Sequence, residues 1–256
     1  MGIGALVSAV LAAGMVGAQN ALDGLEHLGK PKPGGVNFQV AATELARDIL
    51  WLDGFVNIIM GAVVVFVVGL MFYVFIRFNK SANPNPSSFT HNTIVEVAWT
   101  ILPIIVLVFI GVFSLQILFK QQEIPIADVT IKATGYQWYW GYEYPDQEFS
   151  FDSFMLARDQ LEEFGYNPDE YLLATDTVVV VPVGKIIVVQ VTGADVIHSW
   201  AMPAFGVKQD GVPGRLAELW FMVEMEGVYF GQCSELCGKD HTFMPITVKA
   251  VSEETY

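Results

Sequence analysis

The sequence predicts a membrane-anchored all-β protein in which a two-helix transmembrane hairpin precedes a β-sandwich or β-barrel. Three observations support this fold class. The mean hydropathy is +0.46 and hydrophobic residues make up 53% of the chain, which is high for a soluble protein. Two apolar stretches long enough to span a bilayer lie before residue 120. Beyond about residue 126 the hydrophobic pattern alternates with a period of two, which is typical of strands.

Charge is divided unevenly between the two halves of the chain. Residues 1–120 contain six acidic and six basic side chains, whereas residues 121–256 contain 21 acidic and seven basic ones and carry the whole net charge of −14. Such a surface repels nucleic acid, so we expect no nucleic-acid partner. A strongly acidic domain instead attracts a cationic partner.

The N-terminal end has the pattern of a secretory signal peptide. Residues 1–18 are small and apolar and end in Val-Gly-Ala, the kind of sequence that precedes a cleavage site, although the usual basic start is missing. We therefore assign residues 1–18 as a candidate signal peptide. Residues 19–50 contain glycine, proline and mixed charge, which favours an extended external segment.

Residues 51–120 are predicted to form the transmembrane hairpin. Residues 54–76 contain no charged side chain over 23 positions, and residues 94–119 form a second span interrupted only by Glu96 and one proline. A polar link at residues 79–86 connects the two spans. Lysine and arginine are equally frequent at both ends of the spans, so the orientation rests on the signal-like start, which places both chain ends outside.

Residues 121–256 are predicted to fold into an all-β domain. Runs rich in β-branched and aromatic residues alternate with turns that contain glycine and proline, which favours a sandwich or a barrel. An acidic stretch at residues 158–171 interrupts this pattern. Ala157, Leu161 and Phe164 recur there at helical spacing, so we expect a surface insertion with a short helix.

A cluster of soft metal ligands lies near the C-terminal end. Cys233, Cys237, His241 and Met244 fall within twelve positions, and His198 follows a β-branched run whose end could bring it to the same loop. Thiolate, thioether and imidazole together form the ligand set that selects copper, whereas zinc is held by cysteine and histidine. The alternative is a reducible disulfide between the two cysteines, with the histidines and methionine incidental.

The number of ligands predicts two copper ions. A mononuclear blue-copper site needs two histidines, one cysteine and a weak axial methionine, which leaves a second cysteine unused. Two thiolates four positions apart can bridge a pair of copper ions, and each ion then takes one histidine. Met244 and the backbone carbonyl of Glu235 are the expected weak outer ligands. No coordination position remains open for a substrate, so the centre should carry electrons.

Several motifs resemble those of the cytochrome c oxidase subunit II family. The Cys-Ser-Glu-Leu-Cys-Gly sequence that starts at Cys233, followed by His241 and Met244, is similar to the loop that holds the CuA copper pair in that family. The resemblance covers nearly the whole chain, because further motifs follow the hairpin in the family's order. These motifs are Gly-Tyr-Gln-Trp-Tyr-Trp at 135–140, Asp-Val-Ile-His-Ser-Trp at 195–200 and Val-Pro-Gly-Arg at 212–215.

The resemblance implies a cupredoxin-like Greek-key β-barrel on the periplasmic side of a bacterial plasma membrane, or on the equivalent side of a mitochondrial inner membrane. It also implies an oxidase complex with a haem-bearing subunit I and a subunit III. In such a complex this chain accepts electrons from reduced cytochrome c, while subunit I reduces oxygen to water and protons are pumped. The copper ligands that the resemblance implies are His198, Cys233, Glu235, Cys237, His241 and Met244.

The resemblance further implies roles for individual residues. Trp138 would be the exposed point where electrons arrive from cytochrome c, the Glu235 carboxylate would bind Mg²⁺ shared with subunit I, and Glu96 would lie at the mouth of a proton path. Alternatively, Trp138 packs a core and Glu96 is an interfacial carboxylate that reaches water. Acidic residues expected to steer a basic cytochrome c are Glu143, Asp146, Asp152, Asp176 and Asp195.

Three other functions fit the sequence less well. A nitrous-oxide reductase uses a similar copper centre, but its size and soluble architecture differ from this hairpin-bearing chain. A quinol-oxidase-type structural subunit would lack the ligand cysteines and histidines, and a membrane-tethered copper-binding protein would need an open site. The predicted function is therefore electron transfer as subunit II of a cytochrome c oxidase, with the oxygen chemistry in subunit I.

Overall fold

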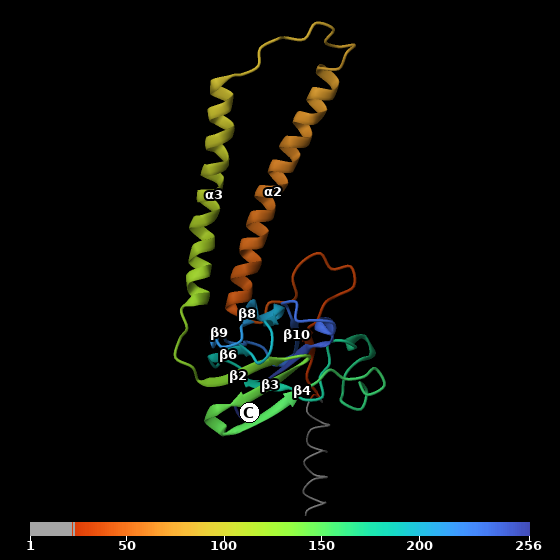
Figure 1. Ribbon diagram of the computed structural model, residues 1–256, viewed down its shortest axis with the longest axis vertical. Coiled ribbons are helices and arrows are strands. Elements are labelled where there is room, and N and C mark those ends of the chain that lie inside the picture. The colour runs from red at the N-terminus through yellow and green to blue at the C-terminus, as the bar shows by residue number, and fades with distance from the viewer. Residues whose placement is uncertain (1–21, 23) are drawn as a thin grey trace, which may run out of the picture. The chain divides into compact units, whose positions relative to one another are not determined.

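The computed structural model describes residue 22 and residues 24–256. The candidate signal peptide at residues 1–18 lies outside the described residues. The chain divides into two compact units, a β domain and a helical hairpin (Figure 1). Of the described residues, the β domain comprises those from 22 to Arg47 together with Gln121–Tyr256, and the hairpin comprises Asp48–Lys120.

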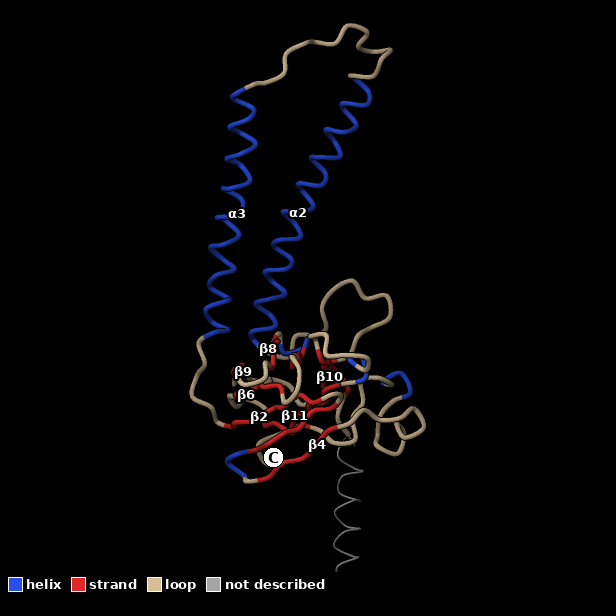
Figure 2. Tube along the Cα trace, viewed as in Figure 1, coloured by secondary structure: helices blue, strands red, loops and turns tan. Residues whose placement is uncertain are grey.

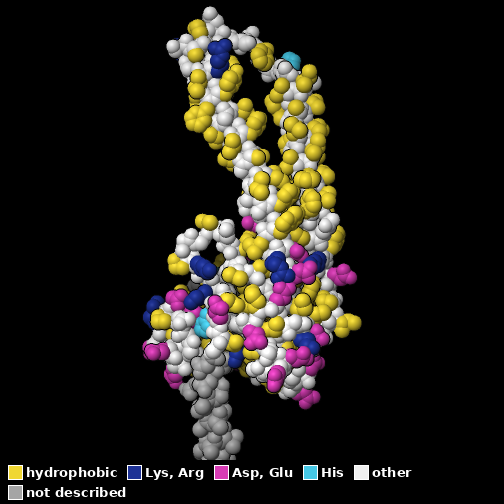
Figure 3. Space-filling model, turned by 180° about the vertical axis from the view of Figure 1, so that it is seen from behind, with side chains coloured by type: hydrophobic (Ala, Val, Ile, Leu, Met, Phe, Trp, Pro, Cys, Tyr) yellow, Lys and Arg dark blue, Asp and Glu magenta, His cyan; other side chains and the backbone are white. Residues whose placement is uncertain are grey.

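Two long apolar helices form the hairpin. They are α2, Glu44–Arg77, and α3, Thr93–Gln122. Both are long and apolar enough to cross a membrane, and no residue of their most apolar windows is buried. Figure 3 shows hydrophobic side chains over the surface of both helices. Since water would not solvate so much apolar surface, the hairpin agrees with the predicted two-pass anchor.

Helix α2 begins well before residue 54, where the predicted apolar span starts. Thr43 caps this helix, because its hydroxyl oxygen accepts a hydrogen bond from Ala46 N at 3.0 Å. The same hydroxyl donates to the carbonyl of Phe205 at 2.7 Å, and Leu45 in the first turn is buried. The first turn of α2 is therefore anchored in the β domain.

Two sheets form the β domain in the part of the chain that the structure describes (Figure 2). The five-stranded sheet has the order β4-β3-β2-β6-β9, and the six-stranded sheet has the order β5-β11-β10-β7-β8 with β1 beside β10. The strands of the first sheet are β2, Val129–Tyr136; β3, Tyr139–Tyr144; β4, Phe149–Ser153; β6, Ile187–Gly193; and β9, Ala217–Phe221. Those of the second are β1, His27–Gly29; β5, Val179–Pro182; β7, His198–Met202; β8, Val207–Gly211; β10, Gly227–Cys233; and β11, Pro245–Val251.

The two sheets pack face to face around one apolar core. Ile131 and Val189 contribute to this core from the five-stranded sheet, and Tyr229 and Val248 contribute from the six-stranded sheet. Strands β2 and β6 pair in parallel, as do β5 and β11, whereas most other neighbours are antiparallel. Because sequence-distant strands pair in parallel, the sheets cannot be simple meanders. The predicted cupredoxin-like fold class is confirmed.

Part of the segment expected to be external, residues 19–50, is built into the β domain. Strand β1 pairs in parallel with β10. Ala42 N donates to Ala204 O at 2.8 Å, and the carbonyl of Ala42 accepts from Glu224 N at 3.0 Å. The segment therefore completes the six-stranded sheet before the chain enters α2.

The prediction of a short helix around Leu161 in the acidic insertion is wrong. Residues 158–165 form turns, and the helical piece that follows is the 3-10 helix η2, Pro168–Glu170. Leu161 and Tyr166 nevertheless lie in a second apolar cluster with Leu22. These apolar residues are therefore spaced so that an irregular loop, and not a helix, can bury them in this cluster.

A buried carboxylate joins the insertion to the N-terminal strand. The side chain of Glu170 is fully buried and accepts hydrogen bonds from Lys30 Nζ at 2.8 Å and from Asn167 N at 2.8 Å. His27 Nδ1 lies 2.8 Å from both carboxylate oxygens. Burial opposes ionisation, but these hydrogen bonds outweigh it and lower the pKa of Glu170 to about 2.

Candidate metal centre

The loop between β10 and β11 carries most of the predicted copper ligands. Strand β10 ends at Cys233, and the 3-10 helix η4, His241–Phe243, precedes β11. The two strands are antiparallel neighbours, and Cys233 N donates to Met244 O at 3.1 Å. The pairing of these strands therefore closes the base of the loop and fixes the backbone positions from which the Cys233 and Met244 side chains extend.

Each of the two cysteine sulfurs has a histidine nitrogen beside it. Cys233 Sγ lies 3.9 Å from His198 Nδ1, and Cys237 Sγ lies 3.6 Å from His241 Nδ1. The two sulfurs are 3.9 Å apart and both cysteines are free, so the structure contains no disulfide between them. The donor atoms of His198, Cys233 and Cys237 all lie within 4.8 Å of one another and could hold a metal ion.

Met244 and Glu235 complete the predicted set at this loop. Met244 is buried and belongs to the same apolar cluster as Cys233 and Cys237. The carbonyl oxygen of Glu235 lies 3.4 Å from Cys233 Sγ. Two thiols, each with an imidazole nitrogen beside it, and a buried methionine in the same apolar cluster fit copper, because soft sulfur donors and imidazole select that metal.

Burial and neighbouring charges separate the pKa values of the two thiols. Burial opposes ionisation of Cys233, but hydrogen bonding to His198 and to the backbone of Glu235 outweighs it and lowers the pKa of its thiol to about 6. Burial and the adjacent Cys233 charge raise the pKa of Cys237. The Cys233 thiol therefore ionises more readily than the Cys237 thiol, and binding a cation would release the protons that remain on the sulfurs.

His198 is held from three sides. It begins β7, and Trp140 on β3 contacts its ring edge to face with centroids 6.0 Å apart. Gly135 on β2 leaves room for the ring, because a Cβ there would lie 2.6 Å from His198 Cγ. The third side is Asp195, whose Oδ1 lies 2.8 Å from His198 Nε2. These contacts leave Nδ1 facing Cys233.

The turn between β2 and β3 places Trp138 against the copper loop. Trp138 is half-buried, and its Nε1 donates to the carbonyl of Cys237 at 3.2 Å. Gly238 follows with φ +127°, and a Cβ there would lie 2.9 Å from Trp138 Cζ2. A direct hydrogen bond thus connects the proposed electron-input residue to a candidate copper ligand.

Gln137 was missed at the level of the sequence. Its side-chain nitrogen donates to Cys237 O at 2.8 Å, and its backbone nitrogen donates to Asp195 Oδ2 at 2.8 Å. Its place inside the aromatic motif at 135–140 was the available signal. The partners lie 58 and 100 positions away, so spacing alone could not reveal these bonds.

Three of the five acidic residues expected to steer a partner lie near this turn. Asp152 and Asp195 both act electrostatically on Tyr139, which follows Trp138; burial and these charges raise the pKa of the Tyr139 hydroxyl. Asp176 accepts a hydrogen bond from Phe154 N at 2.8 Å, and Phe154 stacks on Tyr139.

Of the other two acidic residues, one lies on β3 and one lies beyond its end. Glu143 forms an ion pair with Lys132 at 2.7 Å, which partly neutralises its charge. Asp146 lies beyond the end of β3, in the 3-10 helix η1, Pro145–Gln147. Glu96 belongs to the hairpin, where it is half-buried in the first turn of α3. The structure therefore does not gather all the acidic residues at one point.

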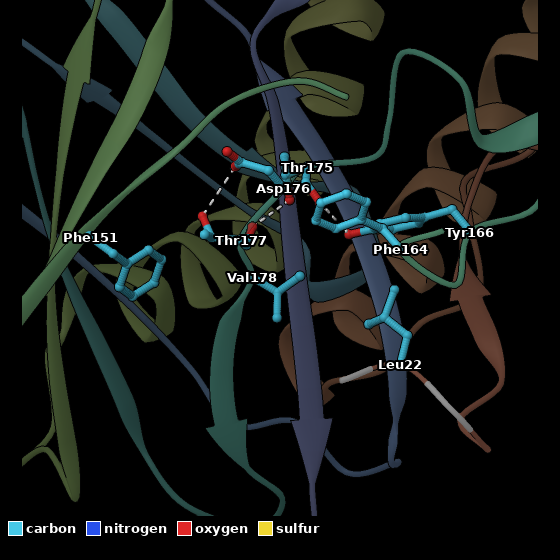
Figure 4. Close-up of a pocket in the computed structure, with 8 residues that line it drawn as sticks. All are labelled: Leu22, Phe151, Phe164, Tyr166, Thr175, Asp176, Thr177 and Val178. Atoms are coloured by element: carbon cyan, nitrogen blue, oxygen red, sulfur yellow. Dashed lines mark hydrogen bonds between the residues drawn. The ribbon is translucent and has the colours of Figure 1, made fainter. Parts of the chain in front are cut away.

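Asp176 also lines a pocket between the insertion and the sheets. This pocket has a volume of about 220 Å³, and Figure 4 shows Asp176, Thr175 and Thr177 on one side and apolar side chains around them. Its lining residues are Leu22, Phe151, Phe164, Tyr166, Thr175, Asp176, Thr177 and Val178. No candidate copper ligand contributes to it.

Comparison with known proteins gives matches over both units. Residues 31–117 match the family described as "Cytochrome C oxidase subunit II, transmembrane domain", and residues 129–251 match "Cytochrome C oxidase subunit II, periplasmic domain". "Cytochrome c oxidase subunit 2" of Cereibacter sphaeroides is 58% identical over 261 residues, covering 96% of this chain and 86% of that relative. "Probable cytochrome c oxidase subunit 2" of Rickettsia bellii is 44% identical over 229 residues, covering 89% of this chain and 83% of that relative.

A solved structure is also similar to part of this chain. The periplasmic domain of subunit II of cytochrome oxidase from Bradyrhizobium japonicum is 56% identical, with a TM-score of 0.47, and the match covers 52% of this chain and 90% of that chain. The decisive comparison is the 58% identity that extends over nearly the full length, hairpin included. On that ground the chain belongs to the cytochrome c oxidase subunit II family.

Proposed function

We propose that this chain binds two copper ions, accepts electrons from reduced cytochrome c and passes them to haem in subunit I of a cytochrome c oxidase. Subunit I would reduce oxygen to water, with proton pumping coupled to that reaction. The observation that carries the proposal is the pairing of one histidine with each of two unbonded cysteine sulfurs, at 3.9 Å and 3.6 Å. His198 with Cys233, and His241 with Cys237, would hold the two copper ions.

The chain's own residues would hold the metal pair without leaving room for a substrate. Cys233, Cys237 and Met244 are buried, which excludes water from the sulfur side. When bound, the copper pair would supply a centre that takes up and releases one electron. His198 at the start of β7 and Cys233 at the end of β10 are held by strands, so these two ligands would move little when that charge changes, which favours fast transfer. The proposed ligands are His198, Cys233, the Glu235 carbonyl, Cys237, His241 and Met244.

Electrons would reach the metal pair through Trp138. Its indole nitrogen bonds to the carbonyl of Cys237, so the path from ring to ligand runs through one hydrogen bond and the residue that also supplies a sulfur. Lys239 Nζ lies 5.5 Å from the centre of the Trp138 ring, on the exposed side of the loop. A haem edge brought against this turn would be close to the copper ligands.

Acidic residues would bring a basic cytochrome c to this face. The net charge of −14 lies entirely in residues 121–256, and opposite charge speeds association by steering the partner. Asp152, Asp176 and Asp195 are the residues nearest the turn, and Glu143 and Asp146 extend the acidic surface along β3. Such docking would require the β domain to lie on the periplasmic side, where the donor would diffuse.

Contacts with the other subunits would complete the site. The Glu235 carboxylate would bind Mg²⁺ at the boundary with subunit I, since a hard cation prefers oxygen donors. Glu96 in the first turn of α3 would stand at the opening of a proton path into subunit I. Subunit III is a further expected neighbour in the complex.

Copper analysis of the purified oxidase tests the proposal. We expect two copper ions per copy of this chain, in addition to any metal held by other subunits, together with a near-infrared band and an EPR signal of one electron shared by two ions. A quinol-type structural subunit would bind none, and a copper-transfer protein would lose its metal readily to a chelator. One copper per chain, or a bond between Cys233 and Cys237 in the working enzyme, would refute the proposal.

A further inference from the structure

Three hydrogen-bond donors converge on the carboxylate of Asp195. Its Oδ1 lies 2.8 Å from His198 Nε2 and accepts from Val196 N at 2.7 Å, and its Oδ2 accepts from Gln137 N at 2.8 Å. The Asp195 side chain is 35% exposed, whereas His198 is fully buried. Asp195 thus has one side toward solvent and the other toward a candidate copper ligand.

The contact with Asp195 selects how His198 presents its ring. A carboxylate is an acceptor only, so a proton on Nε2 satisfies it, and a neutral ring then keeps its lone pair on Nδ1. Nδ1 is the nitrogen that lies 3.9 Å from Cys233 Sγ. Metal-binding histidines commonly donate their other nitrogen to a carboxylate, which fixes both the tautomer and the ring orientation.

The second oxygen of Asp195 connects this histidine to the other half of the loop. Gln137 N is bound to Oδ2, and the Gln137 side chain donates to the carbonyl of Cys237 at 2.8 Å. A continuous chain of hydrogen bonds therefore leads from His198 through Asp195 and Gln137 to Cys237. Both sulfur–histidine pairs are tied to one surface carboxylate.

We propose that Asp195 is a positioning residue for the copper site: it fixes the Nδ1-presenting tautomer of His198 and, through Gln137, the Cys237 side of the loop. This role rests on the proposed copper function and adds to the steering role of Asp195 as one acidic residue among several. Steering needs only the negative charge, whereas positioning needs both oxygen atoms in place. The two roles can therefore be separated by substitution.

Asp195→Asn and Asp195→Glu test the geometric role, and Asp152→Asn is the matched control. Asparagine has a single acceptor oxygen and adds N–H donors, so at least one of the three converging donors loses its partner. Glutamate keeps the charge but carries an extra methylene group, which shifts both oxygens. Asp152 also acts on Tyr139, and its own strand, β4, carries none of the candidate copper ligands.

The variants are compared in the purified oxidase complex. For both Asp195 variants we expect an altered EPR hyperfine pattern, a shifted near-infrared band and loss of that band to a copper(I) chelator roughly 10- to 100-fold faster than in the native complex. Asp195→Glu should retain the native salt dependence of the reaction with cytochrome c. Asp152→Asn should retain the native copper signals and show a weaker salt dependence.

The outcomes separate this inference from the proposed function. If the native complex lacks the two-copper signal, the proposed function fails first. If the native complex has it and both Asp195 variants keep native spectra and native copper release, Asp195 is only a surface charge and the positioning role is overturned. Thermal unfolding of each variant complex checks that altered copper signals do not arise from a misfolded domain, and a spectral change confined to unfolded protein also overturns it.

Discussion

At the scale of single residues, Gly135 shows how closely the strands enclose the candidate copper ligand. The His198 ring occupies the place where a side chain would stand, since a Cβ would lie 2.6 Å from its Cγ. We expect Gly135→Ala to displace that ring, to destabilise the β domain by about 1–3 kcal/mol and to change the copper EPR signal. Chemical denaturation and EPR of the purified protein measure both effects.

Gly141 provides the control for this substitution. It lies in the same β2–β3 ladder, but a Cβ there would meet the side-chain atoms Tyr136 Cε2 at 3.1 Å and Asp152 Oδ1 at 3.2 Å. Those side chains can yield slightly, so Gly141→Ala should leave the copper signal unchanged. Equal effects of both substitutions on the copper signal would contradict the specific role of Gly135.

Trp138 makes the other sharp prediction at this scale. Trp138→Gln removes the indole that bonds to Cys237 O, so electron transfer from cytochrome c should slow by roughly 10- to 100-fold, the range for changes next to metal ligands. Binding of cytochrome c should change little, because the acidic side chains remain. Stopped-flow kinetics and binding measurements separate the two, with Tyr139→Leu as the neighbouring control. An unaltered transfer rate in Trp138→Gln would show that the Trp138 ring contributes to packing and does not carry electrons.

At the scale of elements, the Glu170 cluster makes the joint between β1 and η2 sensitive to acid. Hydrogen bonds from His27, Lys30 and Asn167 lower the pKa of Glu170 from 4.5 to about 2 despite its burial. A lowered pKa stabilises the fold above pH 4.5, and that contribution disappears as the pH falls toward 2. Its size is about 3 kcal/mol at 1.36 kcal/mol per pKa unit.

Glu170→Gln should therefore lower the free energy of unfolding at neutral pH and flatten its decline between pH 4.5 and pH 2. Denaturant titration of the detergent-solubilised chain at several pH values measures this. Glu162→Gln alters an exposed acid of the same insertion and should leave the native pH dependence in place. A Glu170→Gln chain with the native slope would show that the joint does not depend on this carboxylate.

Helix α3 carries an expectation about proton uptake. Glu96 lies in its first turn, where Asn92 Oδ1 caps Val95 N at 3.2 Å. Glu96→Ala should slow turnover and proton uptake of the oxidase while the copper signals stay native, because the residue belongs to the hairpin unit. Glu123→Ala, an exposed acid beyond the other end of α3, should leave uptake unchanged. Native proton uptake in Glu96→Ala would place the proton path elsewhere.

Local patterns predicted most elements, and contacts between distant segments decided the rest. The two spans and the period-two strands were readable because each depends on its own residues. The helix expected near Leu161 did not form, because the packing of Leu161 and Tyr166 beside Leu22 satisfies the same apolar spacing with turns. Strand β1 was missed because three residues with glycine carry no strand signal without the β10 edge.

At the scale of the whole molecule, charge separation predicts a steep dependence on salt. The net charge of −14 lies in residues 121–256, and the screening length falls from about 30 Å at 10 mM to about 8 Å at 150 mM ionic strength. The second-order rate with a basic cytochrome c should fall steeply over this range, whereas electron transfer within the bound complex should not. A flat profile of the second-order rate would exclude steering by these acids.

The candidate site was predictable where its residues are close in sequence. One loop contains four of the predicted metal ligands, Cys233, Cys237, His241 and Met244, so this part of the donor set could be predicted from the sequence. The residues that support these ligands could not be predicted. Asp195 and Gln137 are 58 positions apart, and the hydrogen bond between Asp195 and His198 depends on where β7 begins. Those relations arise from sheet order, which composition and spacing do not encode.

The parallel pairing of β1 with β10 constrains the synthesis and membrane insertion of the chain. The ribosome delivers β1 before either membrane helix and β10 only after both, yet the two strands share hydrogen bonds in one sheet. They can meet only if the intervening chain crosses the bilayer an even number of times. Until β10 emerges, β1 has no partner strand. A polypeptide interrupted after α3 would therefore leave β1 unpaired and accessible to quality-control proteases.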